Sequence, residues 1–476
     1  MARASQGSST YHRYHIGTEA APNVDAWPNR FLVRVNRFQL AKYLILQVFQ
    51  QRGDIKAVTS RPCVYGTFSG PIGGFAPRPQ HCVGCLRCTI QHPETTTIIP
   101  NPAFQALGDS YFKFDYMNAI AYEAETGNTP VKGAGYRGLF GGEGWDGMWT
   151  DMSEIVRPTR DGIHGREFIS TVVDIGEKPS YLIFDDDGKP VGAVPRALSI
   201  PVPFFYDTLP SSVNSEMVTN ILIDAARQTE TLVVLPMGRI ASMKLNDESL
   251  VPLVKAADLD LLKGISFTPK MIELEMQDIS ASDLPSILSG MRSAFPDTTL
   301  ALRLHFTSGE ALLHYQKHGI SIFHLLADYH GCGKDGRFAL DLIREAHLAF
   351  VEAGIRDTVT LIGSGGIVAA EHVPKAIIAG LDLVALDTPL LVALQARFIG
   401  ECRDRIESRF ALPNKLNREW GVQRLKNMTA AWRDQLLEIL GAMGLREVRR
   451  LRGEIGRAMF QDALEREAFA EIEGYK

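Results

Sequence analysis

Between residues 201 and 400 the sequence alternates short apolar runs with amphipathic stretches, and this alternation constrains the fold more than any other feature. An apolar run of about four to eight residues is typical of a buried strand, whereas a longer stretch with apolar residues three or four apart is typical of a helix. Strands that alternate with helices form a parallel sheet covered by helices. The eight strand-like runs are 201–207, 231–236, 264–269, 271–277, 299–306, 321–330, 358–366 and 381–388.

Eight strand–helix units in about 200 residues predict an α/β fold, a closed (β/α)8 barrel of the TIM type. A doubly wound open sheet is the alternative, because it is built from the same units. We predict four parts: an N-terminal region with a cysteine module over 1–130, a glycine-rich lead-in over 131–200, the barrel over 201–400 and a helical extension over 401–476. The extension would cap the barrel or form an arm that binds a partner.

Composition places the chain among ordinary soluble proteins. Hydrophobic residues make up 45% of its 476 residues and charged residues 22%. The net charge of −5 gives no basic field for nucleic acid. The polar start of the sequence has no apolar signal segment, and the apolar run at 40–49 is about half as long as a membrane span. We therefore expect a cytoplasmic protein without a membrane span.

Four of the six cysteines lie between residues 63 and 88, which favours metal ligation over a disulfide framework. The stretch HCVGCLRCTIQHP places three of them at intervals of three, and this spacing lets one tight loop wrap three thiolates around an iron–sulfur cluster. His92 occupies the position where a two-cluster ferredoxin has the cysteine for its other cluster. The sequence therefore predicts a single cluster.

Cys63, in the stretch RPCVYG, is the candidate for the remote fourth ligand. With it, the four thiolates would hold a [4Fe–4S] cluster; without it, three would favour a [3Fe–4S] cluster, or His81 or His92 would complete the site. Structural zinc is the other interpretation, although zinc sites usually use two separated C-x2-C pairs. The predicted ligands are Cys63, Cys82, Cys85 and Cys88.

The seventh run ends in a glycine-rich turn, GSGGIVAAEHVPKAI, directly before a predicted helix. Backbone N–H groups at such a turn bind phosphate, and barrels often hold phosphate on the loops after strands seven and eight. Tight backbone packing is the other explanation of the glycines. FMN is the natural occupant beside an iron–sulfur centre, because a flavin takes electrons singly and passes them on in pairs. The predicted cofactor contacts are Gly363, Ser364, Gly365, Gly366, Asp387 and Thr388.

Two cations near the predicted catalytic end are candidates for contact with a substrate carboxylate or the flavin. Arg303 alternates with apolar residues on the fifth run, and Lys334 follows the sixth. For Arg303, a buried ion pair is the alternative. Cys332, between two glycines, would be reactive only if exposed, and a lone cysteine is more often inert. We interpret His305 and His324 as core or rim histidines.

Residues 131–176, VKGAGYRGLFGGEGWDGMWTDMSEIVRPTRDGIHGREFISTVVDIG, resemble the lead-in of FMN-binding, glutamate-synthase-like proteins, especially short forms without a glutaminase domain. The resemblance continues in the cysteine module, in the glycine-rich turn with the run that follows it, and in LLEILGAMGLREVRRLRGE. It implies a barrel that binds FMN, an adjacent cluster that feeds it, and reduction of 2-iminoglutarate to glutamate.

The chain departs from this family around the flavin ring. YDTLPSSVN replaces a Met-Ser-Phe-Gly-like stretch, VVLPMGRIAS replaces a glycine-rich segment, Arg303 replaces a lysine, and DYHGCGKDG replaces the glycine-rich loop after strand six. The alternative function is therefore an electron-relay or scaffold subunit of a larger redox complex, with a degenerate barrel that has lost glutamate synthase chemistry, with or without FMN. A zinc-stabilised barrel that binds a phosphorylated ligand is a third interpretation.

Partners are expected because two activities have no sequence support. Position 2 is not a cysteine, so glutamine hydrolysis is not expected in this chain. No G-x-G-x-x-G motif follows an early strand, so no NAD(P)H site is expected. Electrons would come from a ferredoxin-like protein or a dehydrogenase subunit, in a hetero-oligomer that would also accommodate a separate glutaminase subunit.

Overall fold

The computed structural model describes residues 14–59, 63–70, 72–130, 142–150, 168–177, 183–191, 197–280 and 282–474. Its centre is a closed barrel of eight parallel strands, in which the last strand pairs with the first through Val384 and Phe204. The predicted (β/α)8 barrel is confirmed, and closure excludes the open sheet. The predicted domain boundaries stay predictions, and most of the resembling segment, 131–141 and 151–167, lies outside the described residues.

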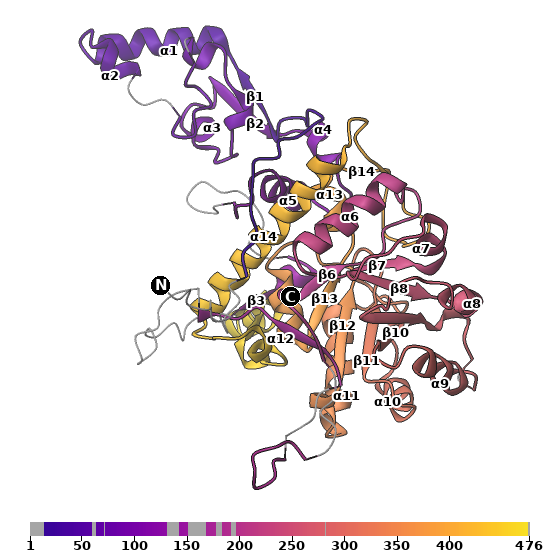
Figure 1. Ribbon diagram of the computed structural model, residues 1–476. Helices are drawn as coiled ribbons and strands as arrows, with labels where there is room; N and C mark the ends of the chain where they lie inside the picture. The colour runs from indigo at the N-terminus through magenta and orange to yellow at the C-terminus, as the bar shows by residue number, and fades with distance from the viewer. Residues whose placement is uncertain are drawn as a thin grey trace, which may run out of the picture.

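The barrel strands are short, and most of their residues are buried. They are β6 (Phe204–Tyr206), β7 (Val233–Pro236), β8 (Leu250–Val254), β9 (Met271–Glu275), β10 (Thr299–His305), β11 (Ile322–Leu326), β12 (Thr360–Ser364) and β13 (Leu383–Leu386). Figure 1 shows the helices around them. These are α6 (Glu216–Gln228), α7 (Met237–Met243), α8 (Leu259–Leu262), α9 (Leu284–Ala294), α10 (Gly309–Lys317), α11 (Ala339–Glu352), α12 (His372–Ala379) and α13 (Thr388–Ala393).

The third barrel strand was predicted at the wrong place. The run 264–269 is a loop, and the third strand is β8, whose five residues are all buried between β7 and β9. Pro252 lies inside β8, and a proline within an apolar run normally argues against a central strand. In β8 it pairs in register with Leu235 of β7.

The cysteines belong to a separate N-terminal module. Its two-stranded sheet pairs β1 (Phe31–Val35) with β2 (Thr96–Pro100), and its small core contains Phe31, Cys82 and Ile98. The stretch FLVRV forms β1, and Asn36 caps the helix that begins after it at Arg37. The module's helices are α1 (Arg37–Gln50), α2 (Ile55–Thr59) and α3 (Arg87–Gln91).

The long helix α14 (Arg418–Ala442) was predicted and packs against α5 (Phe114–Thr126) and α6. Gly441 lies inside α14, and the chain turns at Gly444, whose φ is +68°. Arg424 is fully buried and donates to the carbonyl of Ala21 at 2.7 Å and to that of Ala393. The helix therefore joins the N-terminal segment to the barrel.

The remaining described elements are short. Two-stranded antiparallel pairings join β3 to β16, β4 to β5 and β14 to β15. None of the helices in the described part of the chain combines the length and hydropathy that crossing a membrane requires. These elements are α4 (Pro102–Gln105), β3 (Met148–Thr150), β4 (Val173–Gly176), β5 (Ala197–Ile200), β14 (Arg397–Phe398), β15 (Phe410–Ala411), β16 (Ala458–Phe460) and α15 (Gln461–Phe469).

His347 on α11 lies where the barrel meets the C-terminal segment. A Cβ added to Gly380 would lie 2.4 Å from the His347 side chain, and one added to Gly453 would lie 2.7 Å from its ring. Arg356 donates to His347 Nδ1 at 3.0 Å and pairs with Asp382 at 2.8 Å. Burial, together with the nearby charge of Arg356, lowers the pKa of His347 to about 4.

We expect this histidine to make the protein sensitive to acid. Its folded pKa of about 4 lies below the ordinary value of about 6.5, so between these values the unfolded chain binds the extra proton. Its contribution to stability is therefore lost as the pH falls through this window. The His347→Gln variant should lose less thermal stability from about pH 7 to about pH 4.5 than the unsubstituted protein. His318→Gln, at the C-cap of α10, is the control, and equal slopes for all three proteins would contradict the assignment.

Candidate functional site

A buried network of charges fills the centre of the barrel. Arg303 on β10 donates to Asp207, just after β6, with Nη1–Oδ1 at 2.7 Å and Nη2–Oδ2 at 3.0 Å. Its Nη1 also lies 2.9 Å from Glu273 Oε2 on β9. His324 on β11 places Nδ1 2.7 Å from Glu273 Oε1. The side chains of all four residues are at most 3% exposed.

The charges in this network stabilise one another. Burial raises the pKa of Asp207, but the charges of Arg303, His324 and Arg405 outweigh burial and hold it well below its ordinary value. The pKa of Glu273 is likewise lowered, because His324 and Arg303 offset its burial. Removing one partner of a buried pair typically costs about 3–5 kcal/mol. Arg303 therefore forms the buried ion pair that was its alternative interpretation, and in this arrangement its donors are not available to a substrate.

Arg405 lies over the carboxyl ends of the strands and was not predicted from the sequence. It belongs to the loop between β14 and β15, and its Nη2 donates to Asp387 Oδ2 at 2.8 Å and to Ser364 Oγ at 3.0 Å. Its Nη1 lies 3.5 Å from Asp207 Oδ2. The only sequence signal was the charged segment ECRDRIE soon after the last barrel helix. Arg405 connects the interior network to the predicted phosphate loop.

The glycine-rich loop packs tightly and still offers hydrogen-bond donors. Gly365 and Gly366 have φ of +96° and +72°. A Cβ on Gly365 would lie 2.3 Å from the Asp328 carbonyl oxygen, and one on Gly366 would lie 2.5 Å from Gly331 Cα. Among the residues that the structure describes, no acceptor bonds to the backbone N–H groups of Gly365, Gly366 or Ile367, although all three residues are buried.

Unpaired buried N–H groups are costly, so a ligand or water normally satisfies them. These three amides, together with the Arg405 guanidinium and the Ser364 hydroxyl, make a donor set that fits a phosphate group. Both explanations of the glycines therefore apply, because the same loop needs close packing and leaves amides unpaired.

A tyrosine and a histidine side chain form hydrogen bonds with the backbone of this loop. The Tyr111 hydroxyl donates to the Gly366 carbonyl at 2.8 Å. His372, the first residue of α12, is 1% exposed and accepts the Val368 N–H on Nδ1 at 3.2 Å. Burial lowers the pKa of His372, which suits a neutral ring that accepts a hydrogen bond. The loop is thereby fixed in one shape.

The other predicted cofactor contacts are also buried. Asp387 caps α13 by accepting the Thr388 N–H at 2.6 Å, and its second oxygen accepts from Arg405. Burial raises its pKa. Gly363 lies on β12, where a Cβ would lie 2.5 Å from the Leu381 side chain. In this structure Asp387 orients Arg405, and Gly363 serves packing.

The loop between β11 and α11 carries the two remaining candidates. Lys334 is exposed. The pKa of His305, at the end of β10, is lowered first by the burial of His305 and then by the charge of Lys334. Cys332 is partly exposed, and burial together with Asp328 raises its pKa. A raised pKa favours the thiol over the reactive thiolate, which agrees with the inert interpretation of Cys332.

The four predicted cluster ligands lie in one part of the N-terminal module. Burial raises the pKa of Cys82, and the charges of Cys85 and Cys63 raise it further. The pKa of Cys88 is raised by burial and by Cys82 and Cys85. These mutual effects place the four thiols near one another.

The loop that carries three of them depends on an unusual backbone. Gly84 has a φ of +71°, and a Cβ there would lie 2.2 Å from the Phe31 ring, while Leu86 also has a positive φ of 59°. Four thiolates bound to one zinc ion at about 2.3 Å would lie close to about 3.8 Å apart. Among the described residues, no three cysteine sulfurs lie within 4.8 Å of one another.

One group with metal-binding residue types has a structural explanation. Asp109, His330 and Glu401 have ligand atoms within 4.8 Å of one another. Asp109 accepts from the N–H groups of Phe112 at 2.7 Å and Cys402 at 3.1 Å, and pairs with His330 Nε2 at 2.9 Å. These bonds join the loop before α5 to the loop that carries Arg405.

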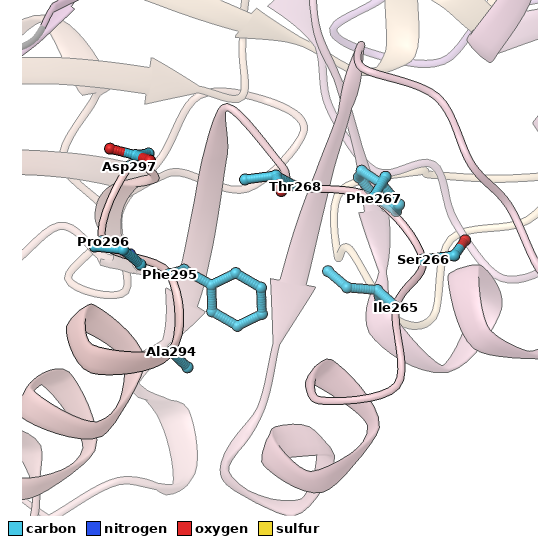
Figure 2. Close-up of a pocket in the computed structure, with 8 residues that line it drawn as sticks. All are labelled: Ile265, Ser266, Phe267, Thr268, Ala294, Phe295, Pro296 and Asp297. Carbon is cyan, nitrogen blue, oxygen red and sulfur yellow. The ribbon is translucent and has the colours of Figure 1, made fainter.

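One surface hollow lies away from these residues. It has a volume of about 440 Å³ and lies between the loops 265–268 and 294–297. Figure 2 shows the Phe295 ring and the Ile265 side chain facing each other across it. These loops lead into β9 and β10, so the hollow lies at the amino ends of the strands, opposite the end where barrel enzymes act.

Comparison with known proteins shows similarity to glutamate synthases. Residues 337–446 match the family described as "Conserved region in glutamate synthase". An archaeal-type glutamate synthase [NADPH] of Dehalococcoides mccartyi is 24% identical over 437 residues, which cover 79% of this chain and 86% of that protein. The archaeal glutamate synthase [NADPH] of Methanocaldococcus jannaschii is 36% identical over 108 residues, or 21% of each protein.

A solved structure overlaps with the chain at low identity. A mandelate oxidase mutant with an FMN adduct is 13% identical, with a TM-score of 0.40, and the overlap covers 74% of this chain and 93% of that one. The sequence matches are a conserved region over residues 337–446 and a 24% identical alignment across most of the chain. In both, the chain is similar to glutamate synthases.

Proposed function

We propose that this chain is an oxidoreductase of the glutamate-synthase type that holds FMN at the carboxyl ends of the barrel strands. The observation that carries the proposal is the set of unpaired, buried amides of Gly365, Gly366 and Ile367 beside Arg405. The glutamate synthase names of the relatives support the same chemistry.

The residues around the loop would each have a defined task. The three amides, the Ser364 hydroxyl and the Arg405 guanidinium would donate to the phosphate of FMN. Asp207 and Asp387 hold Arg405 in position, and Arg303 in turn holds Asp207. Bound FMN supplies the exchange between single electrons and a hydride.

Electrons would enter through an iron–sulfur cluster in the N-terminal module, supplied by a partner redox protein or dehydrogenase subunit. Its ligands would be Cys63, Cys82, Cys85 and Cys88. The positive charge of bound iron would offset the cost of ionising Cys82 and Cys88, whose pKa values burial raises.

The acceptor would be 2-iminoglutarate or a related imine. Because Arg303 is fully engaged, the cation available to a substrate carboxylate is Lys334, which is exposed in the loop after β11. His305 is half-buried at the same end of the barrel, and burial together with the charge of Lys334 keeps it neutral by lowering its pKa. Lys334 would bind the carboxylate, and His305 would border the acceptor.

A second candidate function is an electron-relay or scaffold subunit without flavin. The observation that favours it is that Arg405 already pairs with Asp207 and Asp387 at the carboxyl ends of the strands and is only 15% exposed. In that case Arg405 would be a permanent plug. The unpaired amides of the loop would be satisfied by water.

Flavin analysis distinguishes the two. Acid extraction of anaerobically purified protein should release about one FMN per chain, and Arg405→Gln should bind FMN roughly 10- to 100-fold more weakly, because it removes a charge-assisted bond worth about 1.5–3 kcal/mol. Arg403→Gln, two residues away, is the matched control and should retain FMN. Arg405→Lys should restore part of the affinity.

Absence of FMN from the unsubstituted protein would sink the flavin proposal and favour the relay. Equal retention of FMN by Arg405→Gln would instead remove Arg405 from the phosphate site. Thermal midpoints of all variants check that the barrel network survives each substitution.

Cysteine substitutions test the cluster. Cys85→Ser should lower iron and acid-labile sulfide to a small fraction of the unsubstituted value, because a cluster needs each thiolate. Cys332→Ser, also partly exposed but remote in sequence, should leave both contents unchanged. Metal analysis and electron paramagnetic resonance of reduced, oxygen-free samples give the measurement. Stoichiometric zinc with no iron would refute the redox assignment of the module.

A further inference from the structure

We propose that the outer face of α1 is the docking surface for an acidic one-electron carrier protein that delivers electrons to the cysteine module. The electron-transfer role rests on the cluster proposed above. The surface itself is defined by the exposure and charge of residues in α1, which do not depend on the cluster.

The inner side of α1 packs against the rest of the module. A Cβ on Gly74 would lie 3.0 Å from the Leu40 side chain, so Leu40 fills the space beside that loop. The Tyr43 ring lies 4.4 Å from the ring of His92, four residues after Cys88. The helix is therefore anchored directly against the loops that carry the cysteines.

No part of the chain that the structure describes buries the outer side of α1. Not one of its 14 residues is buried. Four large apolar residues project outward, and Phe38 and Phe49 are 76% and 77% exposed. The second of them follows the first by seven residues, the fourth follows the second by four, and the third is next to the second in sequence. These spacings place all four on one side of the helix, opposite Leu40 and Tyr43. This surface, called the α1 face below, consists of Phe38, Ile45, Leu46 and Phe49.

A concentrated apolar surface of this kind indicates an interaction site, because soluble proteins rarely expose several large apolar side chains together. Figure 1 shows α1 and α2 at the outer end of the module, on the side away from the barrel. A protein that docks on the α1 face would therefore lie against the module without meeting the barrel. Electron transfer requires such proximity, because its rate falls steeply with distance.

Charge identifies the kind of partner. Residues 26–93 contain nine lysines and arginines but a single acidic residue, Asp54, whereas the whole chain has a net charge of −5. Lys42 lies within the α1 face, and Arg37 begins the helix next to Phe38. A basic rim around an apolar centre attracts an acidic protein and steers its approach.

The pattern fits a protein partner better than a lipid surface. In a helix that lies on a membrane, lysine and arginine occupy the polar side, opposite the apolar side. In α1, Lys42 lies among the outward apolar residues, at the spacing of one helical turn from both Phe38 and Ile45. A partner that combines apolar contacts with carboxylates matches this mixture.

The test uses the full-length, cluster-loaded protein and the acidic ferredoxins and flavodoxins of its own source organism, each produced separately. Binding is measured by calorimetry, and reduction of the cluster by stopped-flow absorbance, at low and at moderate salt. At least one carrier should bind, with an affinity that falls as salt rises. Phe38→Ser/Phe49→Ser should weaken binding at least tenfold, and Lys42→Glu should weaken it most at low salt.

Matched controls lie on the outer helices of the barrel. Leu348→Ser/Val351→Ser removes two exposed apolar residues from α11, and Lys317→Glu reverses an exposed charge on α10. Neither should change binding. Because all the substituted side chains are at least partly exposed, unchanged thermal midpoints are expected.

The proposal is overturned if no carrier binds or if the α1 variants bind as well as the unsubstituted protein. Cosedimentation with vesicles of anionic phospholipid that depends on Phe38 and Phe49, without carrier binding, would assign the α1 face to a membrane surface and also overturn it. Iron and sulfide assays on the same samples separate the two proposals. Carrier binding without iron would defeat the cluster and leave the docking surface standing.

Discussion

The buried ion pair between Arg303 and Asp207 determines the chemistry at the carboxyl end of the barrel. Asp207 has no exposed surface, so its charge requires a partner inside the protein. Arg303 bonds both Asp207 oxygens and also pairs with Glu273, which in turn contacts His324. Asp207 Oδ2 also faces Arg405. The position of Arg405, and with it the donor set around the phosphate loop, therefore follows from a charge balance deep in the barrel.

The glycine-rich loop satisfies two requirements with the same residues. Gly365 and Gly366 allow the loop to pack against the backbone of residues 327–331, where any side chain would collide. Their φ values are positive, and among the described residues no acceptor bonds to their amides. This combination explains why the glycines of the proposed phosphate loop are required by packing as well as by a ligand. Packing preserves the loop even where the neighbouring chemistry differs.

The cysteine module and the barrel are different kinds of structure. The barrel is stabilised by a large apolar core, whereas the module has a small core around Phe31, Cys82 and Ile98. The module also exposes Phe38 and Phe49 on α1. A bound cluster would add stability to a module with so little apolar burial. In the proposed arrangement, one side of α1 packs against the cysteine loops and the other side binds a partner.

Much of the fold was readable from local pattern, because periodicity reports burial. The alternation of runs predicted the barrel, and the spacing of the cysteines and the glycines at 363–366 located the two candidate sites. The third strand was misplaced because Pro252 interrupts the apolar run that forms β8. The sequence alone also identified Arg303 as a choice between substrate contact and ion pair. Only the tertiary structure decided that choice and revealed Arg405, because the partners of these charges come from distant strands and loops that closure of the barrel brings together.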